Sequence, residues 1–542
     1  MSSRVKNRRR RRFLQLSMSA AAWLCSGVLG CRSTTGDPTA EEVAPPTLSA
    51  LELTAQAEDP HLNQGPAPGL LRIAMSSLPN TFDPPFFTTP GAYICGFIIY
   101  DSLVWLDQSL TPQPRLAEQW ESDKTGLQWT FQLRRDVTFH HGTAFTAADV
   151  VYTMMRLLDP TLNSPQLSVL GFINEVKALD DYTVRFSLDF PNTDLPLLLA
   201  APQACILARD YPLKQMLTKP SGTGPFRFST LLRGEHVYYL RNQDYWAADQ
   251  VPLTEIRQIH IGDFAEQVTA LLQDKVDLLV DIEADAIARL TQNPDTVVLE
   301  APSGRYQPLV MRVNGTPFQD NRVRQAIKAC IDRTALQQQV LYGRGEVGND
   351  HPVPAISPYW ADLPLQIQDY TKARQLLAEA GYPTGIQLQL VTANAAPGMV
   401  KLAQVVQAMA EPAGIQIEVI EVKVSGDIYF NNYWGRPPFF VSIWEFRPSI
   451  YETFAIGYYS QSAWNETGLV DPELDKVLDE ARGVLDFEQR KTLYKRAQQL
   501  MIEEGAVIIP YFQPVLTGLR KRVQGFMPHP AGWVDLRNVQ TI

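Results

Sequence analysis

The stretch TGLQWTFQLRRDVTFHHGTAFTAADVVYTMMRLLDP, residues 125–160, carries the clearest structural pattern of this 542-residue chain. From Gln128 to Leu133 polar and apolar residues alternate, which is the period of a strand with one buried face. A polar turn at Asp136 follows, and the alternation resumes at Val137 and Phe139. This pattern predicts a first strand, a turn and a short second strand.

A helix is predicted directly after this hairpin. Thr146 can cap its N-terminus together with Asp149, in a weaker, aspartate version of the capping box. Asp159-Pro160 ends the helix. The apolar residues between these signals recur at helical spacing: Val150, Val151, Met154, Leu157 and Leu158. None of these residues forms a reactive arrangement, so the stretch by itself predicts packing rather than chemistry.

Length and composition bound the class of protein. A chain of 542 residues exceeds one ordinary hydrophobic core, so more than one lobe is expected. Hydrophobic residues make up 45% of the chain and charged residues 20%, as in soluble globular proteins. After the N-terminal region, no segment has the length of an uncharged membrane span, and we expect that the body does not cross a bilayer.

The N-terminal thirty residues have the pattern of an export signal, with basic residues up to Arg12 and an apolar segment from Leu14 to Gly30. Residues 10–14, RRRFL, resemble a twin-arginine motif with departures on both sides, so twin-arginine and Sec export both stay open. Residues 28–31, VLGC, resemble a bacterial lipobox and predict lipidation of Cys31; a chance cysteine after small residues is the alternative. Cleavage before Cys31 would remove seven basic and no acidic residues and change the formal charge from -10 to -17 (-10 minus 7). Such an acidic mature chain disfavours nucleic acid as a partner.

Several motifs in chain order extend the evidence beyond the opening stretch. They are W-x-F-x-L-R at 129–134, V-x-F-x-x-G at 137–142, F-T-A-x-D-V at 145–150, GTGPF at 222–226, RNQDYW at 241–246, P-F-x-D-x-x-V-R-x-A at 317–326 and IDR at 331–333. Together they closely resemble the signature of the family 5 extracellular solute-binding proteins, which are the oligopeptide-, dipeptide- and nickel-binding receptors of ABC importers. The resemblance runs from about Leu70 to the C-terminus.

The resemblance implies an α/β, two-lobed periplasmic-binding-protein fold of type II, in the three-subdomain, peptide-binding class, with hinge strands between the lobes. The implied divisions are an export signal with lipobox in 1–30, a flexible tether in 31–68, lobe 1 in 69–110, 226–314 and 509–542, an accessory subdomain of lobe 1 in 111–225, and lobe 2 in 315–508. Closure of such lobes around a solute is the expected motion.

The predicted solute site combines two kinds of evidence. Asp281 follows the short apolar strand predicted at Val276–Val280, where ligands of open α/β sheets collect, although a solvated carboxylate is the alternative. The resemblance places Thr88 and Thr89 at the cleft mouth, with an ordinary polar loop as the alternative. It also places Trp444, Glu445, Phe446 and Arg447 in the cleft. Further cleft candidates are Tyr306, Trp434 and Tyr511. The last part of lobe 2 is rich in aromatic residues, some of which must be core.

The chain departs from the pattern of this family at one position. Peptide receptors of the family carry W-x-x-D, whose aspartate pairs with the α-amino group of the ligand, whereas Trp444 is followed here by Arg447. Three interpretations stay open: Arg447 binds a carboxylate or phosphate of another ligand, Glu445 or Asp281 replaces the aspartate, or Arg447 faces solvent.

Motifs of catalysis and of metal binding are not found in the sequence. It has no H-E-x-x-H, G-x-S-x-G or P-loop pattern, and 429–464 contains no histidine, so no cofactor and no directly bound metal are expected. Cys95, Cys205 and Cys330 lie among apolar residues and are expected to be buried thiols, with the presence of a disulfide left open.

The sequence therefore predicts a non-catalytic, monomeric lipoprotein of the periplasm or cell envelope, held at the membrane by its lipid anchor alone. It would capture a peptide or peptide-like solute and pass it to the permease and ATPase subunits of an ABC importer. The alternatives are a receptor or sensor for a non-peptide anionic solute, opine-like or metallophore-like, and an exported hydrolase.

Overall fold

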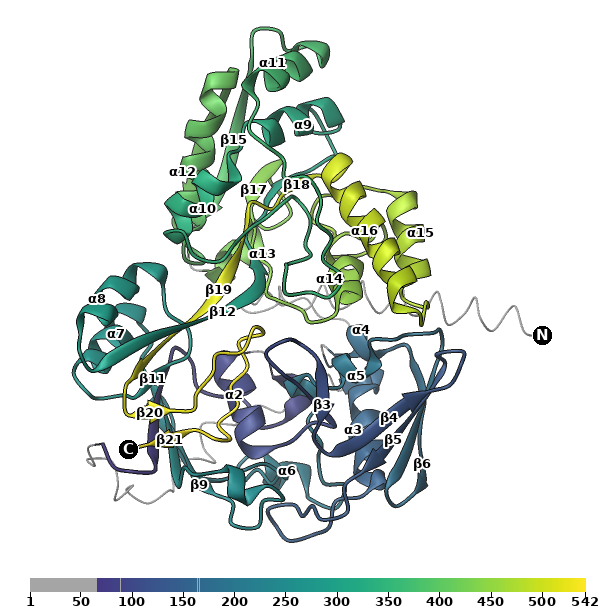
Figure 1. Cartoon of the computed structure of the whole chain (residues 1–542), viewed down its shortest axis with the longest axis vertical. Coiled ribbons are helices and arrows are strands. Elements are labelled where there is room, and N and C mark those ends of the chain that lie inside the picture. Colours follow the sequence, from purple (N-terminus) through teal and green to yellow (C-terminus); the bar gives the residue numbers. More distant parts are fainter. Residues whose placement is uncertain (1–65, 88, 163, 165, 425) are drawn as a thin grey trace, which may run out of the picture. The chain divides into compact units, whose positions relative to one another are not determined.

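The computed structural model describes residues 66–542, apart from residues 88, 163, 165 and 425. The predicted export signal, the lipidation site Cys31, nearly all of the predicted tether and the candidate Thr88 lie outside the described residues. The folded chain divides into two compact units. Unit 1 contains 302–514, and unit 2 contains the described residues up to Ala301 together with 515–542. Figure 1 shows the elements of each unit.

Unit 2 is built on a main sheet whose strand order is β12-β19-β11-β1-β10-β9-β8. β1 pairs in parallel with β10 and β11, and β9 pairs antiparallel with β10 and β8. The strands of this sheet are β1 (Leu70–Met75), β8 (Phe226–Leu232), β9 (His236–Arg241), β10 (Glu255–His260), β11 (Leu278–Leu279), β12 (Thr296–Tyr306) and β19 (Tyr511–Arg520).

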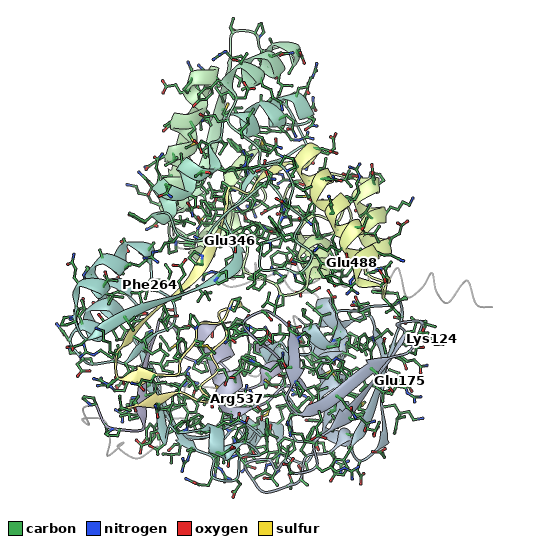
Figure 2. All side chains as sticks on the ribbon, viewed as in Figure 1. Lys124, Glu175, Phe264, Glu346, Glu488 and Arg537 are labelled. Carbon is green, nitrogen blue, oxygen red and sulfur yellow. The ribbon has the colours of Figure 1, made fainter. Side chains whose placement is uncertain are left out.

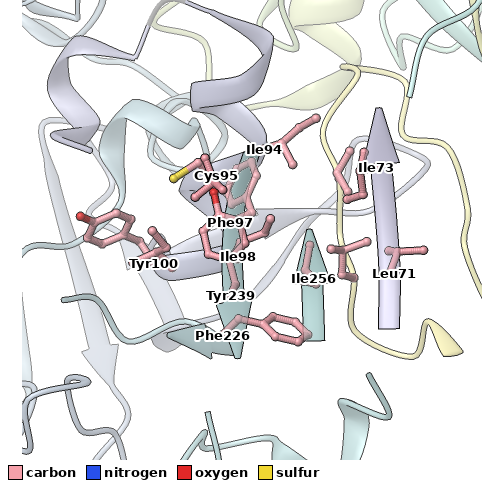
Figure 3. Packing of buried hydrophobic residues seen from close by; sticks show 14 of the residues in the cluster. Leu71, Ile73, Ile94, Cys95, Phe97, Ile98, Tyr100, Phe226, Tyr239 and Ile256 are labelled. Atoms are coloured by element: carbon pink, nitrogen blue, oxygen red, sulfur yellow. The ribbon is translucent and has the colours of Figure 1, made fainter. Parts of the chain in front are cut away.

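One core cluster of unit 2 lies between this sheet and α2 (Pro90–Ile99). Every residue of β1, LLRIAM, is buried, which is typical of a parallel strand covered on both faces. Figure 3 shows Leu71 and Ile73 of β1 in the same buried cluster as Ile94 and Phe97 of α2. Arg72 is tolerated in this strand because its Nε lies 2.8 Å from Oδ2 of the buried Asp277.

The opening stretch of the sequence contributes β5, an inner strand of a second sheet in unit 2, with strand order β4-β5-β7-β6. β5 (Gln128–Leu133) buries Trp129, Phe131 and Leu133, which confirms the predicted strand. The predicted second strand is wrong in extent, because a single bridge between Thr138 and Ala144 is all that forms there. The other strands are β4 (Ala117–Ser122), β6 (Ile173–Asp180) and β7 (Thr183–Leu188).

The predicted helix is α3 (Ala147–Leu157), and the Thr146 N–H donates to Asp149 Oδ2 at 2.9 Å, as the capping pattern predicts. It packs on the second sheet. The remaining elements of unit 2 are α4 (Leu167–Leu170), α5 (Leu195–Leu198), α6 (Leu213–Met216), α7 (Phe264–Leu272), α8 (Ile287–Gln292), β2 (Val104–Leu106), β3 (Pro112–Pro114), β20 (Val523–Gln524) and β21 (Gln540–Thr541).

Unit 1 contains a mixed sheet in the order β16-β15-β17-β13-β18. Its strands are β13 (Leu309–Met311), β15 (Ile386–Ala393), β16 (Ile415–Val422), β17 (Phe439–Val441) and β18 (Val507–Ile508), and β14 (Glu346–Val347) pairs with β19. Its helices are α9 (Asn321–Ala329), α10 (Arg333–Leu341), α11 (Tyr370–Glu379), α12 (Met399–Ala410), α13 (Gly426–Asn432), α14 (Ile450–Gly457), α15 (Pro472–Ala481) and α16 (Phe487–Glu503).

The divisions between the units fall inside two long strands. The chain passes from unit 2 to unit 1 within β12, after Ala301, and returns within β19, after Pro514. The family resemblance implied crossings at the ends of neighbouring motifs, near 314 and 508. A strand extends beyond the motif that identifies it, so motif ends locate such a crossing only approximately.

Candidate functional site

The most unusual polar group of unit 1 is the carboxylate of Glu466, a residue that is only 3% exposed. Its Oε1 accepts a hydrogen bond from Trp444 Nε1 at 2.8 Å. Its Oε2 accepts two, from Trp434 Nε1 at 2.7 Å and from Ser442 Oγ at 2.7 Å. Two indoles and a hydroxyl therefore converge on one buried carboxylate. We call Glu466, Trp434, Ser442 and Trp444 the indole–carboxylate cluster.

The chain brings these residues together through β17 and a tight turn. Ser442 and Trp444 directly follow β17, and Trp444 forms an antiparallel bridge with Tyr306. Glu466 lies in a turn that Asn465 closes, since its Oδ1 accepts the Gly468 N–H at 3.1 Å. Gly468 takes a φ of +68°, a conformation that glycine adopts without strain. The backbone therefore fixes the position of the carboxylate.

Burial dominates the electrostatics of Glu466. It raises the pKa of the carboxyl to about 7, while the hydrogen bonds from Trp444, Ser442 and Trp434 and the charge of Arg312 act in the opposite direction. A buried carboxylate is normally paired with arginine or lysine. Here the hydrogen-bond donors in the described part of the chain are neutral, so this carboxyl can exchange its proton near neutral pH.

Aromatic rings extend from the cluster. The rings of Tyr306 and Trp444 are nearly parallel, at 8° with centroids 6.5 Å apart, and Tyr458 lies beyond Trp444 at 6.3 Å. Trp434 contacts Trp464 at 5.4 Å, and Trp464 is 42% exposed. This set of rings, from buried Tyr306 to exposed Trp464, is called the aromatic wall. Tyr306, Trp444 and Tyr458 are at most 5% exposed, so the accessible ring surface of the wall belongs to half-buried Trp434 and exposed Trp464. Exposed rings offer a large contact area at a modest cost in rotamer entropy.

Arg447, the departure from the family pattern, is partly exposed and has partners within its own segment. Its Nε lies 3.5 Å from Glu452 Oε1, its Nη1 donates to the Glu445 carbonyl oxygen at 3.2 Å, and its guanidinium lies 5.3 Å from the centre of the Trp444 ring. A carboxylate of the same chain therefore offsets its charge. Glu445 itself is exposed.

Phe446 packs closely on β12. A Cβ added at Gly304 would lie 2.1 Å from Cδ2 of the Phe446 ring and 3.0 Å from Cγ of Pro354. Only glycine leaves space for this ring at that point of the strand. Phe446 is half-buried, so part of its surface stays open beside the aromatic wall.

Two other predicted site residues are buried. Tyr306 is 1% exposed, and its hydroxyl lies 3.0 Å from that of Tyr458. Tyr511 is fully buried, and its hydroxyl donates to Gln307 Oε1 at 2.8 Å. Burial raises the pKa of both phenols, so they stay neutral at ordinary pH. These tyrosines shape unit 1 from inside.

The remaining predicted residues belong to unit 2. Thr89 is the N-cap of α2 and accepts a hydrogen bond from the Ala92 N–H at 3.3 Å, which gives it a structural task. Asp281 lines a cavity of about 100 Å³ together with Glu283, Asp285 and Arg289. Within unit 1 the structure brings Tyr306, Trp434, Trp444 and Phe446 together with Arg447, while Thr89 and Asp281 lie in a different unit.

Sequence reasoning missed Glu466. It is the one charged residue between Glu452 and Asp471, in a segment otherwise made of neutral residues. That isolation was a usable signal, because a lone carboxylate in an aromatic segment must either be exposed or find donors. Which of the two applies depends on the turn after Asn465, which no apolar periodicity reveals.

A second polar cluster, in unit 2, has the residue types of a hydrolytic triad. His141 Nδ1 lies 2.7 Å from Ser221 Oγ, and His141 Nε2 lies 3.4 Å from Asp210 Oδ1. Thr143 Oγ1 lies closer to the same Nε2, at 2.7 Å, and Ser221 is only 4% exposed. A catalytic serine must reach its substrate, so this geometry is better suited to fixing a loop.

Within the described ranges, no group of three or more histidine, cysteine, aspartate or glutamate side chains is arranged to hold a metal ion. Cys95, Cys205 and Cys330 are buried free thiols. Burial raises the pKa of the Cys95 and Cys330 thiols to about 12. They are therefore packing residues rather than nucleophiles.

Comparison with known proteins identifies the family. The family described as bacterial extracellular solute-binding proteins, family 5, middle part, matches residues 111–466. The chain belongs to this family. Family 5 proteins are substrate-binding components of ABC importers, and the family is a non-catalytic one.

Relatives with curated names show the range of this family. The chain is 27% identical to a di/tripeptide-binding protein of Pseudomonas aeruginosa, over 87% of this chain and 95% of the relative. It is 26% identical to heme-binding protein A of Haemophilus influenzae, over 80% of this chain and 85% of the relative. These relatives have different ligands, so membership of family 5 does not fix the solute.

The fold agrees with that of solved family structures. The periplasmic binding protein DppA of Helicobacter pylori, in complex with peptide STSA, matches with a TM-score of 0.74 and 23% identity, over 87% of this chain and 98% of that chain. The fold of this family 5 protein is accordingly the α/β fold of the type II, peptide-binding class of periplasmic binding proteins. Among the helices that the structure describes, none combines the length and the apolar character needed to span a membrane.

Proposed function

We propose that this family 5 protein captures a peptide or peptide-like solute and delivers it to the permease and ATPase subunits of an ABC importer. The observation that carries the proposal is the aromatic wall of unit 1, which holds its two central indoles on Glu466. Similarity to a di/tripeptide-binding protein along 87% of the chain supports the same class of solute. A peptide fits such a wall because side chains of varied shape can pack on rings.

The alternative, an anionic non-peptide solute, depends on Arg447 as a free cation. Glu452 lies 3.5 Å from the Arg447 guanidinium and offsets its charge, so this site offers an incoming anion less attraction than a lone arginine would. The peptide proposal is therefore preferred. Thr89 and Asp281 stay predictions from the sequence, which single variants can test in the same binding experiment.

Isothermal titration with short peptides tests the proposal. Purified protein is titrated with a panel of di- and tripeptides, with citrate as an anionic non-peptide control. We expect saturable binding of several peptides, and weaker binding after Trp434→Ala, because that variant removes an indole from the wall. Saturable binding of citrate without any peptide would instead favour the anionic alternative.

Arg447→Ala separates the two proposals further. A peptide that rests on the aromatic wall should keep its affinity within about threefold in this variant, since the Arg447 charge is already offset. A solute gripped by Arg447 should lose about tenfold or more, the cost of a charge-assisted hydrogen bond. Glu452→Gln, which releases the Arg447 charge, is the matched control and should strengthen binding only of an anion.

The proposal includes the cell envelope as the place of action. Lipidation of Cys31 would anchor the exported chain, and the acidic mature body would stand in the periplasm as a monomer. Fractionation of cells tests this part. The parent chain should sediment with membranes, and Cys31→Ala should either appear in the soluble fraction or remain as unprocessed precursor. A variant that still sediments as processed protein would rule out the lipid anchor at Cys31.

A further inference from the structure

The indole–carboxylate cluster joins three separate points of unit 1. Trp434 follows α13, Ser442 and Trp444 follow β17, and Glu466 lies in the turn before α15. Trp434 Nε1 also lies 3.0 Å from Ser442 Oγ. The indole and the hydroxyl both donate to the same carboxylate oxygen, Glu466 Oε2. One charged group thus orients two of the three indoles of the aromatic wall, Trp434 and Trp444, at once.

Protonation of Glu466 changes the hydrogen bonds that its carboxyl group can form. An indole N–H is a donor only, so it cannot accept a hydrogen bond from a protonated carboxyl. The acid proton has one suitable partner in the cluster, the hydroxyl of Ser442, which must then turn its own hydrogen away from Oε2. The indoles would keep hydrogen bonds to a neutral carboxyl instead of an anion, and such bonds are roughly half as strong. Protonation therefore loosens both indoles together.

Among the described titratable groups of the cluster and its surroundings, Glu466 is the one whose protonation changes near neutral pH. Arg312 is the cation whose charge acts on the carboxyl. Tyr306, Tyr429 and Tyr458 also interact electrostatically with it, and burial raises the pKa of each of these phenols. These tyrosines stay protonated when Glu466 ionises. Burial places the pKa of Glu466 itself at about 7, inside the range that an exported protein meets.

We propose that Glu466 is a positioning residue of the solute site, whose ionised form holds Trp434 and Trp444 in the orientation that binds the solute. The inference rests on the proposed function and adds a regulation to it, because solute affinity then falls in mildly acidic medium. If the protonated form does not bind, the competent fraction is about one tenth at pH 6 and nine tenths at pH 8. Affinity should then be about tenfold weaker at pH 6 than at pH 8.

The positioning role is tested without any solute. Protein labelled with ¹⁵N in its tryptophans, purified as the full exported chain in mild detergent, is titrated from pH 5 to pH 9. The indole N–H resonances are assigned with Trp→Phe variants. Those of Trp434 and Trp444 should move together with a midpoint near 7. Trp129, whose Nε1 donates to the carbonyl oxygen of Asn192 at 3.2 Å, is the internal control and should stay still.

Two variants complete this test. Glu466→Gln should abolish the common movement of the two resonances. Glu346→Gln should leave it intact, since Glu346, labelled in Figure 2, is a half-buried carboxylate of unit 1 whose Oε2 accepts the Ala355 N–H at 3.0 Å. The role assigned to Glu466 is overturned if neither resonance titrates between pH 5 and pH 9 in the parent, or if both still titrate in Glu466→Gln.

The regulation is tested with a peptide that binds in the titration described above. The ratio of its affinities at pH 8 and pH 6 should be about ten for the parent and less than about two for Glu466→Gln. Titration of the peptide's own amino group affects both proteins equally, so the difference between them isolates Glu466. Equal ratios in both proteins would overturn the coupling. If no peptide binds, the proposed function fails, while the indole resonances still decide whether Glu466 positions the two indoles.

Discussion

In each unit a buried carboxylate accepts hydrogen bonds from aromatic donors, but different groups surround the two carboxylates. In unit 2, Asp101 is fully buried and accepts from Trp246 Nε1 at 3.3 Å, but Arg115 Nε also lies 2.5 Å from its Oδ1. In unit 1, Glu466 is almost as deeply buried, and its hydrogen-bond donors in the described residues are two indoles and a hydroxyl.

The difference indicates a structural role for Asp101 and a functional role for Glu466. Arg115 supplies a fixed positive charge that pairs with the buried Asp101 carboxylate, as in a structural ion pair. Glu466 lacks a cation at hydrogen-bond distance among the described residues, so its charge depends on pH. That arrangement costs stability when the carboxyl ionises. Proteins accept such costs mainly at functional sites.

The largest expected effect comes from removing the cation of the first cluster. Arg115→Met leaves Asp101 buried with neutral donors only, and we expect a loss of about 3–5 kcal/mol in the free energy of unfolding. Urea denaturation measures it. The control is Arg496→Met, because Arg496 pairs with Glu473 at 2.8 Å on the surface and should cost less than about 1 kcal/mol. Similar losses in both variants would show that the Arg115 charge does not stabilise the buried Asp101 more than a surface ion pair would.

The second prediction concerns the pH dependence of Glu466. The folded protein keeps this proton up to about pH 7, whereas the unfolded chain releases it near its ordinary pKa of 4.5. Between these values the unfolded state binds fewer protons, so stability falls as pH rises. The parent should lose roughly 3 kcal/mol relative to Glu466→Gln between pH 4.5 and pH 8. A constant difference between the two proteins across this range would contradict the account.

His529 should show the opposite sign in unit 2. Its Nε2 lies 3.0 Å from the Leu106 carbonyl oxygen and its Nδ1 accepts the Ala531 N–H, which fixes a neutral ring. Burial lowers its pKa from 6.5 to about 4. Its contribution is fully present above pH 6.5 and is lost as pH falls toward 4, by up to roughly 3 kcal/mol. His529→Gln should flatten this acid limb, as thermal denaturation at pH 8 and pH 5 will show.

The smallest effect is steric and lies beside the aromatic wall. In Gly304→Ala the new Cβ meets the Phe446 ring at 2.1 Å, so the ring must move, and we expect a cost of about 1–3 kcal/mol. Gly315→Ala is the matched control in the same unit, because nothing lies within 4 Å of the Cβ position there. Denaturation of both variants is the measurement. If Gly304→Ala is as stable as Gly315→Ala, Phe446 is mobile rather than fixed.

Periodicity and capping predicted the local elements well. The alternation from Gln128 to Leu133 became β5, and Thr146 with Asp149 began α3 where expected. Both signals depend only on neighbouring residues, so they can be read without knowledge of the tertiary fold. The short strand after Asp136 was wrong, because a strand needs a partner, and the chain supplies only one bridge there.

The candidate site was less accessible to sequence reasoning. Trp444 was named from the family resemblance and Trp434 from the local concentration of aromatic residues, but their common anchor, Glu466, was not named. The anchor depends on a turn and on contacts more than 20 residues apart in the chain. Arg447 was noticed because it breaks a motif, whereas its partner Glu452 follows no motif and is visible only in the structure.

Native mass spectrometry of residues 50–542 tests the central claim most directly. The protein is purified from bacteria and sprayed without denaturation, so that a co-purified solute stays bound. The account predicts a series of complexes whose added masses fit short peptides and disappear on denaturation. A single added mass that fits no peptide would contradict the claim that this family 5 protein is a peptide receptor.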